Sequence, residues 1–323
     1  MSDVQAYIGR ELGRFTSEIL EFLRIPSVSA QSHHDADTRR TAEWLRDKME
    51  GAGLKAEVLE TDGHPVVLGE WRGAGSDAPT VLVYGHYDVQ PAEPLELWDS
   101  PPFEPEFRDG RLYARGSTDD KGQLYLHIKA AEAHLKDAGS LPINLIVLAE
   151  GEEEVGSPNL VPFVEAHKER LACDAVVISD TGMFAPDLPA LLFSLRGLAY
   201  FEVRVVGPLS DLHSGEYGGP VVNPATALGR ILATLHDDQG RITVDGFYDD
   251  VLDWDQETRD GIRDLPFDED EFEESLGAAP AGGEPGFSIL ERLWIRPTCE
   301  INGLLSGYTG EGAKTVLPAE AMA

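Results

Sequence analysis

The sequence contains few cysteines, few basic residues and no long apolar run. Its two cysteines, Cys173 and Cys299, are too few for a disulfide framework, so we expect a protein of a reducing, cytoplasmic compartment. No apolar stretch approaches the length of a membrane span, and the opening residues MSDVQAYIGRELGRF lack the apolar core of a secretory signal. We therefore expect neither a disulfide-stabilised secreted protein nor an integral membrane protein.

The shortage of basic residues leaves the chain strongly acidic. Lys and Arg number 26 against 58 Asp and Glu, which gives a formal net charge of −32. A field this negative repels nucleic acids and anionic membranes, so we expect neither as a partner. The acids are spread over the whole chain, which is typical of a halophilic surface, where salt screens self-repulsion. Such a surface also contains carboxylate clusters by chance.

Apolar periodicity predicts that strands and helices alternate over residues 1–195. Helical spacing covers 3–24, 38–52, 120–138 and 158–168, and strand-like runs cover 54–60, 65–71, 79–85, 143–149 and 174–179. This alternation favours an α/β domain around a central sheet that is mixed and largely parallel.

The pattern changes after Arg196, where we predict a smaller α+β domain over 196–323. Residues 198–206, LAYFEVRVV, alternate apolar and polar side chains, as in a half-solvated strand of an antiparallel sheet. Residues 223–237 follow as a helix, which Asn223 is suited to cap.

Acidic residues and a histidine gather where the predicted strands of the first domain end. These are His86 and Asp88 after 79–85, Asp119 and Asp120 in a glycine-flanked turn, Glu153 and Glu154 after 143–149, and Asp180 after 174–179. Each motif alone has a structural explanation, as a side-chain pair, a turn or a helix cap. Together they indicate a ligand site, because sites in open α/β sheets lie at the carboxyl ends of strands.

An oxygen-rich cluster with few imidazoles and no thiolate suits a pair of divalent ions. In co-catalytic hydrolases one carboxylate bridges two such ions, and a free glutamate beside them takes a proton from water. We interpret Glu154 as held by a cation and Glu153 as the base. Glu150 and Glu152 are then expected to be solvated charges.

At these residues the sequence resembles the M20 family of metallopeptidases, most closely its dipeptidase and carnosinase-like branch. The similar motifs are GHYDVQP, GRLYARGSTDDKGQ, EGEEEVGS, ISD and DLHSGEYGG, in that order over nearly the whole chain. The resemblance implies a zinc-peptidase-like catalytic domain at 1–195 and a lid and dimerisation domain at 196–323.

The resemblance also implies roles for individual residues. His86 and Asp180 would bind one metal ion, Glu154 the other, and Asp119 would bridge them. The ions would be Zn²⁺, with Mn²⁺ or Co²⁺ as alternatives.

Two further acids of the first domain have implied roles. Asp88 would orient the His86 imidazole, and Glu153 would be the general base and acid. A cis peptide bond is implied between Asp119 and Asp120.

In the second domain the resemblance implies residues that contact substrate. His213 is similar to a histidine that reaches into the active site of the partner subunit of a homodimer and stabilises the oxyanion. Thr315 resembles a substrate-contacting threonine. Asn223 is a further candidate, although helix capping explains it equally well.

Family members continue past the lid domain, with a last metal-binding histidine and a substrate-binding arginine. No histidine follows His236 here, so we expect a fragment in which both domains are incomplete. The predicted function is a di-metal-dependent dipeptidase that hydrolyses short peptides as a homodimer. The alternatives are an N-acyl-amino-acid deacylase of the desuccinylase or acetylornithine deacetylase type, and an inactive remnant that only binds metal or peptide.

Overall fold

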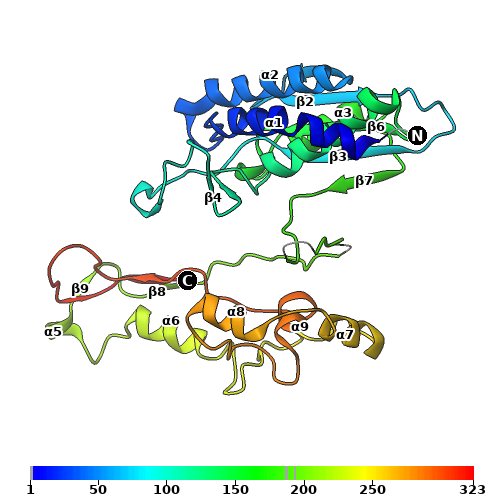
Figure 1. The fold of residues 1–323 in the computed structure, drawn as a ribbon. Coiled ribbons are helices and arrows are strands. Elements are labelled where there is room, and N and C mark those ends of the chain that lie inside the picture. Colours follow the sequence, from blue (N-terminus) through cyan, green and yellow to red (C-terminus); the bar gives the residue numbers. More distant parts are fainter. Residues whose placement is uncertain (1–2, 186–187, 193) are drawn as a thin grey trace. The chain divides into compact units, whose positions relative to one another are not determined.

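The computed structural model describes residues 3–185, 188–192 and 194–323. The chain divides into two compact units, Met1–Ala190 and Leu191–Ala323 (Figure 1). This division lies close to the boundary expected near residue 195. The catalytic and lid roles of the two parts stay predictions.

Unit 1 is built around a five-stranded sheet. Its strands, in the order β1-β2-β6-β3-β7, are β1 (Lys55–Leu59), β2 (Val66–Trp71), β6 (Asn144–Glu150), β3 (Thr80–His86) and β7 (Ala175–Ile178). The α/β class and the mixed sheet are confirmed, but only the β6–β3 and β3–β7 pairings are parallel. The sheet is less parallel than expected because the short connection from β1 to β2 imposes an antiparallel hairpin, and β2 is also antiparallel to β6.

Helices cover both faces of this sheet. They are α1 (Val4–Leu23), α2 (Asp35–Ala52), α3 (Lys121–Ala138) and α4 (Leu160–His167). Side chains of α1, α2 and α3, such as Phe22, Leu45 and Ile128, pack on one face, where Figure 1 shows these helices together. Phe163 of α4 packs with Leu68 on the other face. The predicted helix and strand positions in this unit are confirmed to within a few residues.

The parallel pairs place three strand ends at one edge. His86 at the end of β3 is the register partner of Glu150 at the end of β6. On the other side of β3, Tyr84 pairs with Ile178, the last residue of β7. The segments that follow β3, β6 and β7 therefore leave the sheet side by side. A small hairpin, β4 (Glu106–Arg108) with β5 (Arg111–Tyr113), and the 3-10 turns Ser32–His34, Leu95–Leu97 and Glu153–Val155 complete the unit.

Unit 2 contains short strands and helices. The strands are β8 (Arg204–Val206), β9 (Leu212–His213), β10 (Leu305–Ser306), β11 (Val316–Leu317) and β12 (Glu320–Met322), paired as β10-β12-β8 and β11-β9, all antiparallel. The helices are α5 (Ser214–Tyr217), α6 (Pro224–Leu232), α7 (Gln256–Arg263), α8 (Glu269–Leu276) and α9 (Ile289–Trp294). Glu291 of α9 is fully buried and accepts hydrogen bonds from Arg259 and Arg263, which ties α7 to α9.

Two predicted elements of unit 2 are shorter than expected. The strand expected at 198–206 is reduced to β8, and backbone pairing extends only to Val203, which exchanges two hydrogen bonds with Ala323. Within the described part of the chain, residues 198–202 have no strand partner, so alternation alone does not make them a strand. The helix expected at 223–237 ends at Leu232, because Thr234 and Leu235 form tighter bonds to carbonyls three residues back.

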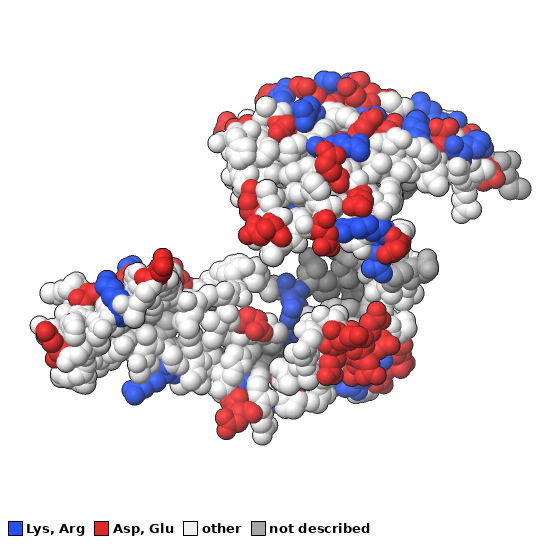
Figure 2. Space-filling view, turned by 60° about the vertical axis from the view of Figure 1, so that its left-hand side comes forward, with Lys and Arg blue, Asp and Glu red and all other residues white. Residues whose placement is uncertain are grey.

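The acidic residues lie on the surfaces of both units. Figure 2 shows Asp and Glu side chains distributed over the visible face of each unit, with Lys and Arg between them. Among the helices of the described ranges, none combines the length and the apolar character needed to cross a bilayer.

A group of charged side chains joins α1 to α3 beside the apolar core. Lys129 Nζ lies 2.7 Å from a carboxylate oxygen of Glu18 and 2.7 Å from one of Glu132. Glu18 also accepts from Tyr125 Oη at 2.8 Å. Burial raises the pKa of Glu18, but the hydrogen bonds from Lys129 and Tyr125 outweigh it and lower the pKa to about 2.

We predict that Glu18→Gln lowers the free energy of unfolding by about 1–3 kcal/mol at pH 7, because the charged hydrogen bonds are lost. The folded-state pKa lies below the ordinary value of 4.5, so the stabilisation is fully present above pH 4.5 and disappears as the pH falls toward 2. Urea unfolding at pH 7 and pH 3 measures both effects. Glu21→Gln, on the same helix with its side chain 58% exposed, is the control; equal losses in the two variants would contradict the prediction.

Candidate metal centre

His86 is the centre of the candidate site. Its side chain is fully buried at the end of β3. Its Nε2 atom lies 3.0 Å from Oδ1 of Asp119, in the turn before α3, and 3.6 Å from Oδ2 of Asp180, which follows β7. One ligand atom from each of these three residues lies within 4.8 Å of the ligand atoms of the other two.

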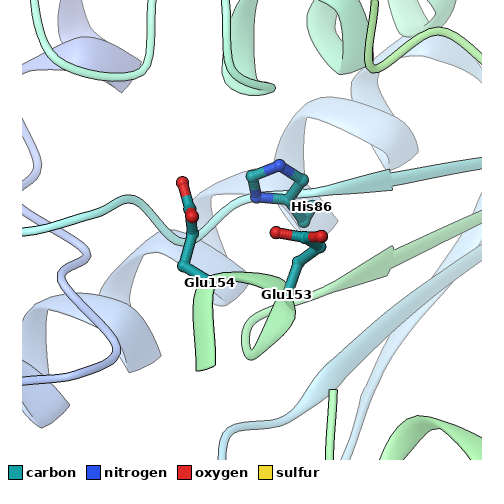
Figure 3. Close-up of side chains that lie close together, drawn as sticks. All are labelled: His86, Glu153 and Glu154. Atoms are coloured by element: carbon teal, nitrogen blue, oxygen red, sulfur yellow. The ribbon is translucent and has the colours of Figure 1, made fainter. Parts of the chain in front are cut away.

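Glu153 and Glu154 approach the same imidazole from another side. They lie in the 3-10 turn Glu153–Val155 that follows β6, here called the glutamate turn, and Figure 3 shows both carboxylates near the His86 ring. Each offers an oxygen within 4.8 Å of the other's oxygen and of a His86 nitrogen. The structure therefore brings together all five residues that the sequence analysis assigned to the ions and the base.

Asp88 connects the histidine to the glutamate turn. This fully buried carboxylate places Oδ1 3.3 Å from His86 Nδ1 and accepts the backbone N–H groups of Glu153 at 3.2 Å and Glu154 at 3.1 Å. The Asp88 carbonyl oxygen is also 3.1 Å from Nδ1. With acceptors on this side, Nδ1 carries a proton, and Nε2 is the nitrogen that faces Asp119 and Asp180.

The turn before α3 approaches the end of β3 very closely. The Asp119–Asp120 peptide bond is cis, as the resemblance implied. Asp120 is buried, and its Oδ2 accepts from the His86 backbone N–H at 3.2 Å. A Cβ atom at Gly85 would lie 2.6 Å from this oxygen, so any larger residue there would have to displace the Asp120 carboxylate. Among the described residues no hydrogen-bond partner reaches Asp120 Oδ1.

The pKa values reflect uncompensated negative charge. Burial lowers the pKa of His86, but its hydrogen bond to Asp88 and the nearby carboxylates outweigh this and raise it to about 10. Burial raises the pKa of Asp120 to about 7. For Glu153 and Asp180 the pKa is also raised, mainly by burial and further by neighbouring carboxylates. Removing these groups from water while they repel one another destabilises the anionic forms.

A divalent cation fits this donor set. The converging atoms are carboxylate oxygens and one imidazole nitrogen, without a thiolate, which suits hard or borderline dications. Such an ion neutralises charges that otherwise repel. Glu154 behaves like the other acids: burial raises its pKa, while a hydrogen bond with Gln90 opposes the rise.

The expectation that Glu150 and Glu152 are solvated is wrong. Both are buried, with exposed fractions of 2% and 7%. Glu150 accepts hydrogen bonds from the Tyr84 hydroxyl and from Ser157 at 2.9 Å. Glu152 accepts from Asn159 at 2.8 Å and from the His64 backbone N–H at 3.1 Å. These hydrogen bonds replace the lost contacts with water, and they connect the residues before the glutamate turn to Ser157 and Asn159 after it.

Within unit 2, two of the three predicted site residues, His213 and Thr315, lie on neighbouring segments. His213 is exposed on β9, opposite Val316 of β11, and its Nδ1 accepts from the Gly215 backbone N–H at 3.1 Å. Thr315 immediately precedes β11, and its carbonyl accepts from Ser214 at 3.5 Å. His213 and Thr315 are therefore neighbours. The Asn223 side chain accepts from Ala225 at 2.8 Å and caps α6.

Sequence reasoning missed Ser29 and Lys121. Ser29 Oγ donates to Asp88 Oδ2 at 2.6 Å from a loop 59 residues earlier in the chain. Lys121 is fully buried next to the Asp119–Asp120 turn. Ser29 carries no local signal, whereas a lysine on the apolar side of the predicted helix at 120–138 was a sign of a specific partner.

Comparisons with known proteins agree with this geometry. Residues 82–300 match the family model described as "Peptidase family M20/M25/M40". The chain is 35% identical to the Cys-Gly metallodipeptidase dug1 of Schizosaccharomyces pombe, over 97% of this chain and 68% of that protein. It is also 35% identical to the human Beta-Ala-His dipeptidase, over 98% of this chain and 66% of that protein.

A solved structure is similar across the same region. It is the M20 family metallo-carboxypeptidase Sso-CP2 from Sulfolobus solfataricus, with a TM-score of 0.81 and 36% identity over 95% of this chain and 69% of that chain. The present chain thus spans about two thirds of the length of these relatives. The match in fold, motif order and sequence places the chain in peptidase family M20/M25/M40, among homologues of metallodipeptidases.

Proposed function

We propose that the protein is a di-metal dipeptidase that hydrolyses short peptides with a free amino terminus. The observation that carries this proposal is the convergence of His86, Asp119 and Asp180 on one side and Glu153 and Glu154 on the other. Relatives named for Cys-Gly and Beta-Ala-His dipeptides support a dipeptide substrate.

The metal-binding roles are those that the family resemblance implies, and the approach of Asp119 and Asp180 to His86 Nε2 supports the first of them. His86 Nε2, with Asp180, would hold one ion, Asp119 would be shared, and Glu154 would hold the other. When bound, the two dications, Zn²⁺ or alternatively Mn²⁺ or Co²⁺, supply Lewis acidity that polarises the peptide carbonyl and acidifies a water molecule. Asp88 keeps a proton on His86 Nδ1, so that Nε2 is the nitrogen that would lose its proton and bind the ion.

Glu153 is the proposed proton carrier. Its pKa is raised by burial and by nearby acids, so its carboxylate is a stronger base than an exposed glutamate. The carboxylate would take a proton from the attacking water, and the resulting carboxylic acid would give that proton to the leaving amine. Its backbone N–H is held by Asp88, which fixes where the side chain begins.

Unit 2 would complete the site from a second subunit. His213 is exposed, and its Nε2 remains available while Nδ1 accepts from Gly215. In a homodimer this imidazole would stabilise the oxyanion, with Thr315 contacting substrate beside it. The Asn223 side chain is engaged in capping α6, so a substrate role requires it to leave that hydrogen bond.

We predict that Glu153→Gln lowers kcat for a free-amine dipeptide by about 10²- to 10⁴-fold, since the amide cannot accept and return the proton. Zn²⁺ content should be unchanged, because the role assigned to Glu153 is proton transfer. Initial rates on Cys-Gly and β-Ala-His, with metal analysis of each variant, provide the measurement.

Glu165→Gln, at an exposed position of α4, is the matched control and should retain full activity. An N-acetylated amino acid should be hydrolysed poorly by the wild type. Faster hydrolysis of the N-acetylated compound than of dipeptides would favour a deacylase, and equal dipeptide rates in Glu153→Gln and wild type would refute the assigned role.

We also predict that binding of the first Zn²⁺ releases about one proton at pH 7. The raised pKa of His86, about 10, means that the free imidazole is protonated, and the proton must leave before Nε2 can bind an ion. Affinity should therefore increase about tenfold per pH unit between pH 6 and 8. Calorimetry in buffers of different ionisation enthalpy counts the protons; His33→Ala, at an exposed histidine, should give the same count. An affinity independent of pH would contradict the prediction.

A further inference from the structure

The segment Phe22–Ser29, here called the strap, runs from the end of α1 to the metal centre. Its apolar side chains are buried: Phe22 and Leu23 are fully inaccessible, and Ile25 and Val28 nearly so. None of the roles assigned above involves this segment. Its polar contacts nevertheless lead to residues of the site.

Lys121 holds the first half of the strap. This fully buried side chain, the first residue of α3, donates from Nζ to the carbonyl oxygens of Phe22 at 3.2 Å and Ile25 at 2.7 Å. A buried lysine without such partners would be strongly destabilising. Because Lys121 directly follows the Asp119–Asp120 turn, the strap and that turn are fixed relative to each other.

The second half of the strap pairs with the residues that flank Asp88. Ser27 Oγ donates to the Tyr87 carbonyl at 2.7 Å, and the Val89 backbone N–H donates to the Ser27 carbonyl at 2.9 Å. Val28 and Val89 form an isolated parallel bridge. This pairing continues the backbone hydrogen bonding past the end of β3. It also places the next residue, Ser29, against the Asp88 side chain.

Ser29 makes the contact that reaches the site itself. Its Oγ donates to Asp88 Oδ2 at 2.6 Å, shorter than the bonds from the Glu153 and Glu154 amides, at 3.2 and 3.1 Å. With Oδ2 occupied by Ser29 and the Glu154 amide, the carboxylate plane is set so that Oδ1 faces His86 Nδ1. A rotation of this plane would alter the contacts of Asp88 with the His86 imidazole and with the backbone N–H groups of both glutamates at the same time.

We infer that the strap is a positioning device in which Ser29 sets the orientation of Asp88, and through it the geometry of His86, Glu153 and Glu154. Ser29 touches no reacting atom, so it is a positioning residue. Its consequence for catalysis rests on the proposed function, whereas its effect on Asp88 does not.

The test compares two serines of the same strap in the full, metal-free chain. Ser29→Ala removes the bond to Asp88, whereas Ser27→Ala removes a bond to a backbone carbonyl and leaves Asp88 untouched. We expect hydrogen exchange at the Glu153 and Glu154 amides to accelerate about tenfold in Ser29→Ala and by less than about twofold in Ser27→Ala. Exchange in buried β6, at Ile146 and Val147, should be unchanged in both.

Ser29→Thr keeps the hydroxyl and should restore slow exchange. Equal acceleration of the two glutamate amides in Ser29→Ala and Ser27→Ala, or none in Ser29→Ala, would overturn the inference. Calorimetric titration with Zn²⁺ adds a functional measure, with about a tenfold weaker affinity expected for Ser29→Ala alone. If the wild-type chain binds no Zn²⁺, the proposed function fails, while the exchange experiment still decides the role of the strap.

Discussion

Repulsion among acids that meet at one edge of a sheet is the constraint on which the organisation of unit 1 depends. Parallel pairing of β3 with β6 and β7 brings Glu153 and Asp180 to the His86 imidazole, and the turn before α3 adds Asp119. Without a cation the anionic forms of these acids are disfavoured: burial first, and neighbouring carboxylates second, raise the pKa of Glu153 and Asp180. The surrounding structure holds the acids in place in spite of the repulsion.

Asp88 shows how the structure does this. Its buried carboxylate is satisfied by a serine hydroxyl and two backbone amides and lies beside the histidine, so its negative charge is compensated by donors from three segments. Asp88 and Ser29, which would not touch a cation, thereby hold His86, Glu153 and Glu154, which would lie next to it. Glu150 and Glu152 serve similarly on the other side of the glutamate turn, through Tyr84, Ser157 and Asn159.

The part of the candidate site that could be predicted consists of charged residues near the ends of predicted strands. His86, Glu153 and Asp180 come at or within a few residues of the ends of apolar runs, so their meeting at one edge could be inferred from the strand pattern and from where sites lie in α/β sheets. Burial of Glu150 and Glu152 was not predictable, because it depends on partners such as Asn159 that only the folded turn brings near. The length of β8 was not predictable either, since a strand needs a neighbour as well as an alternating pattern. Ser29 lies outside any pattern because its partner is far along the chain.

Gly85 has no side chain, and this lets two segments of the site approach each other closely. A Cβ atom there would lie 2.6 Å from Asp120 Oδ2, so the missing side chain lets the end of β3 lie against side chains at the start of α3. Asp119 belongs to that same turn, and its Oδ1 lies 3.0 Å from His86 Nε2. A larger residue at position 85 would have to displace the Asp120 carboxylate, which accepts from the His86 backbone N–H, so it would act on the histidine through the backbone although every assigned ligand was retained.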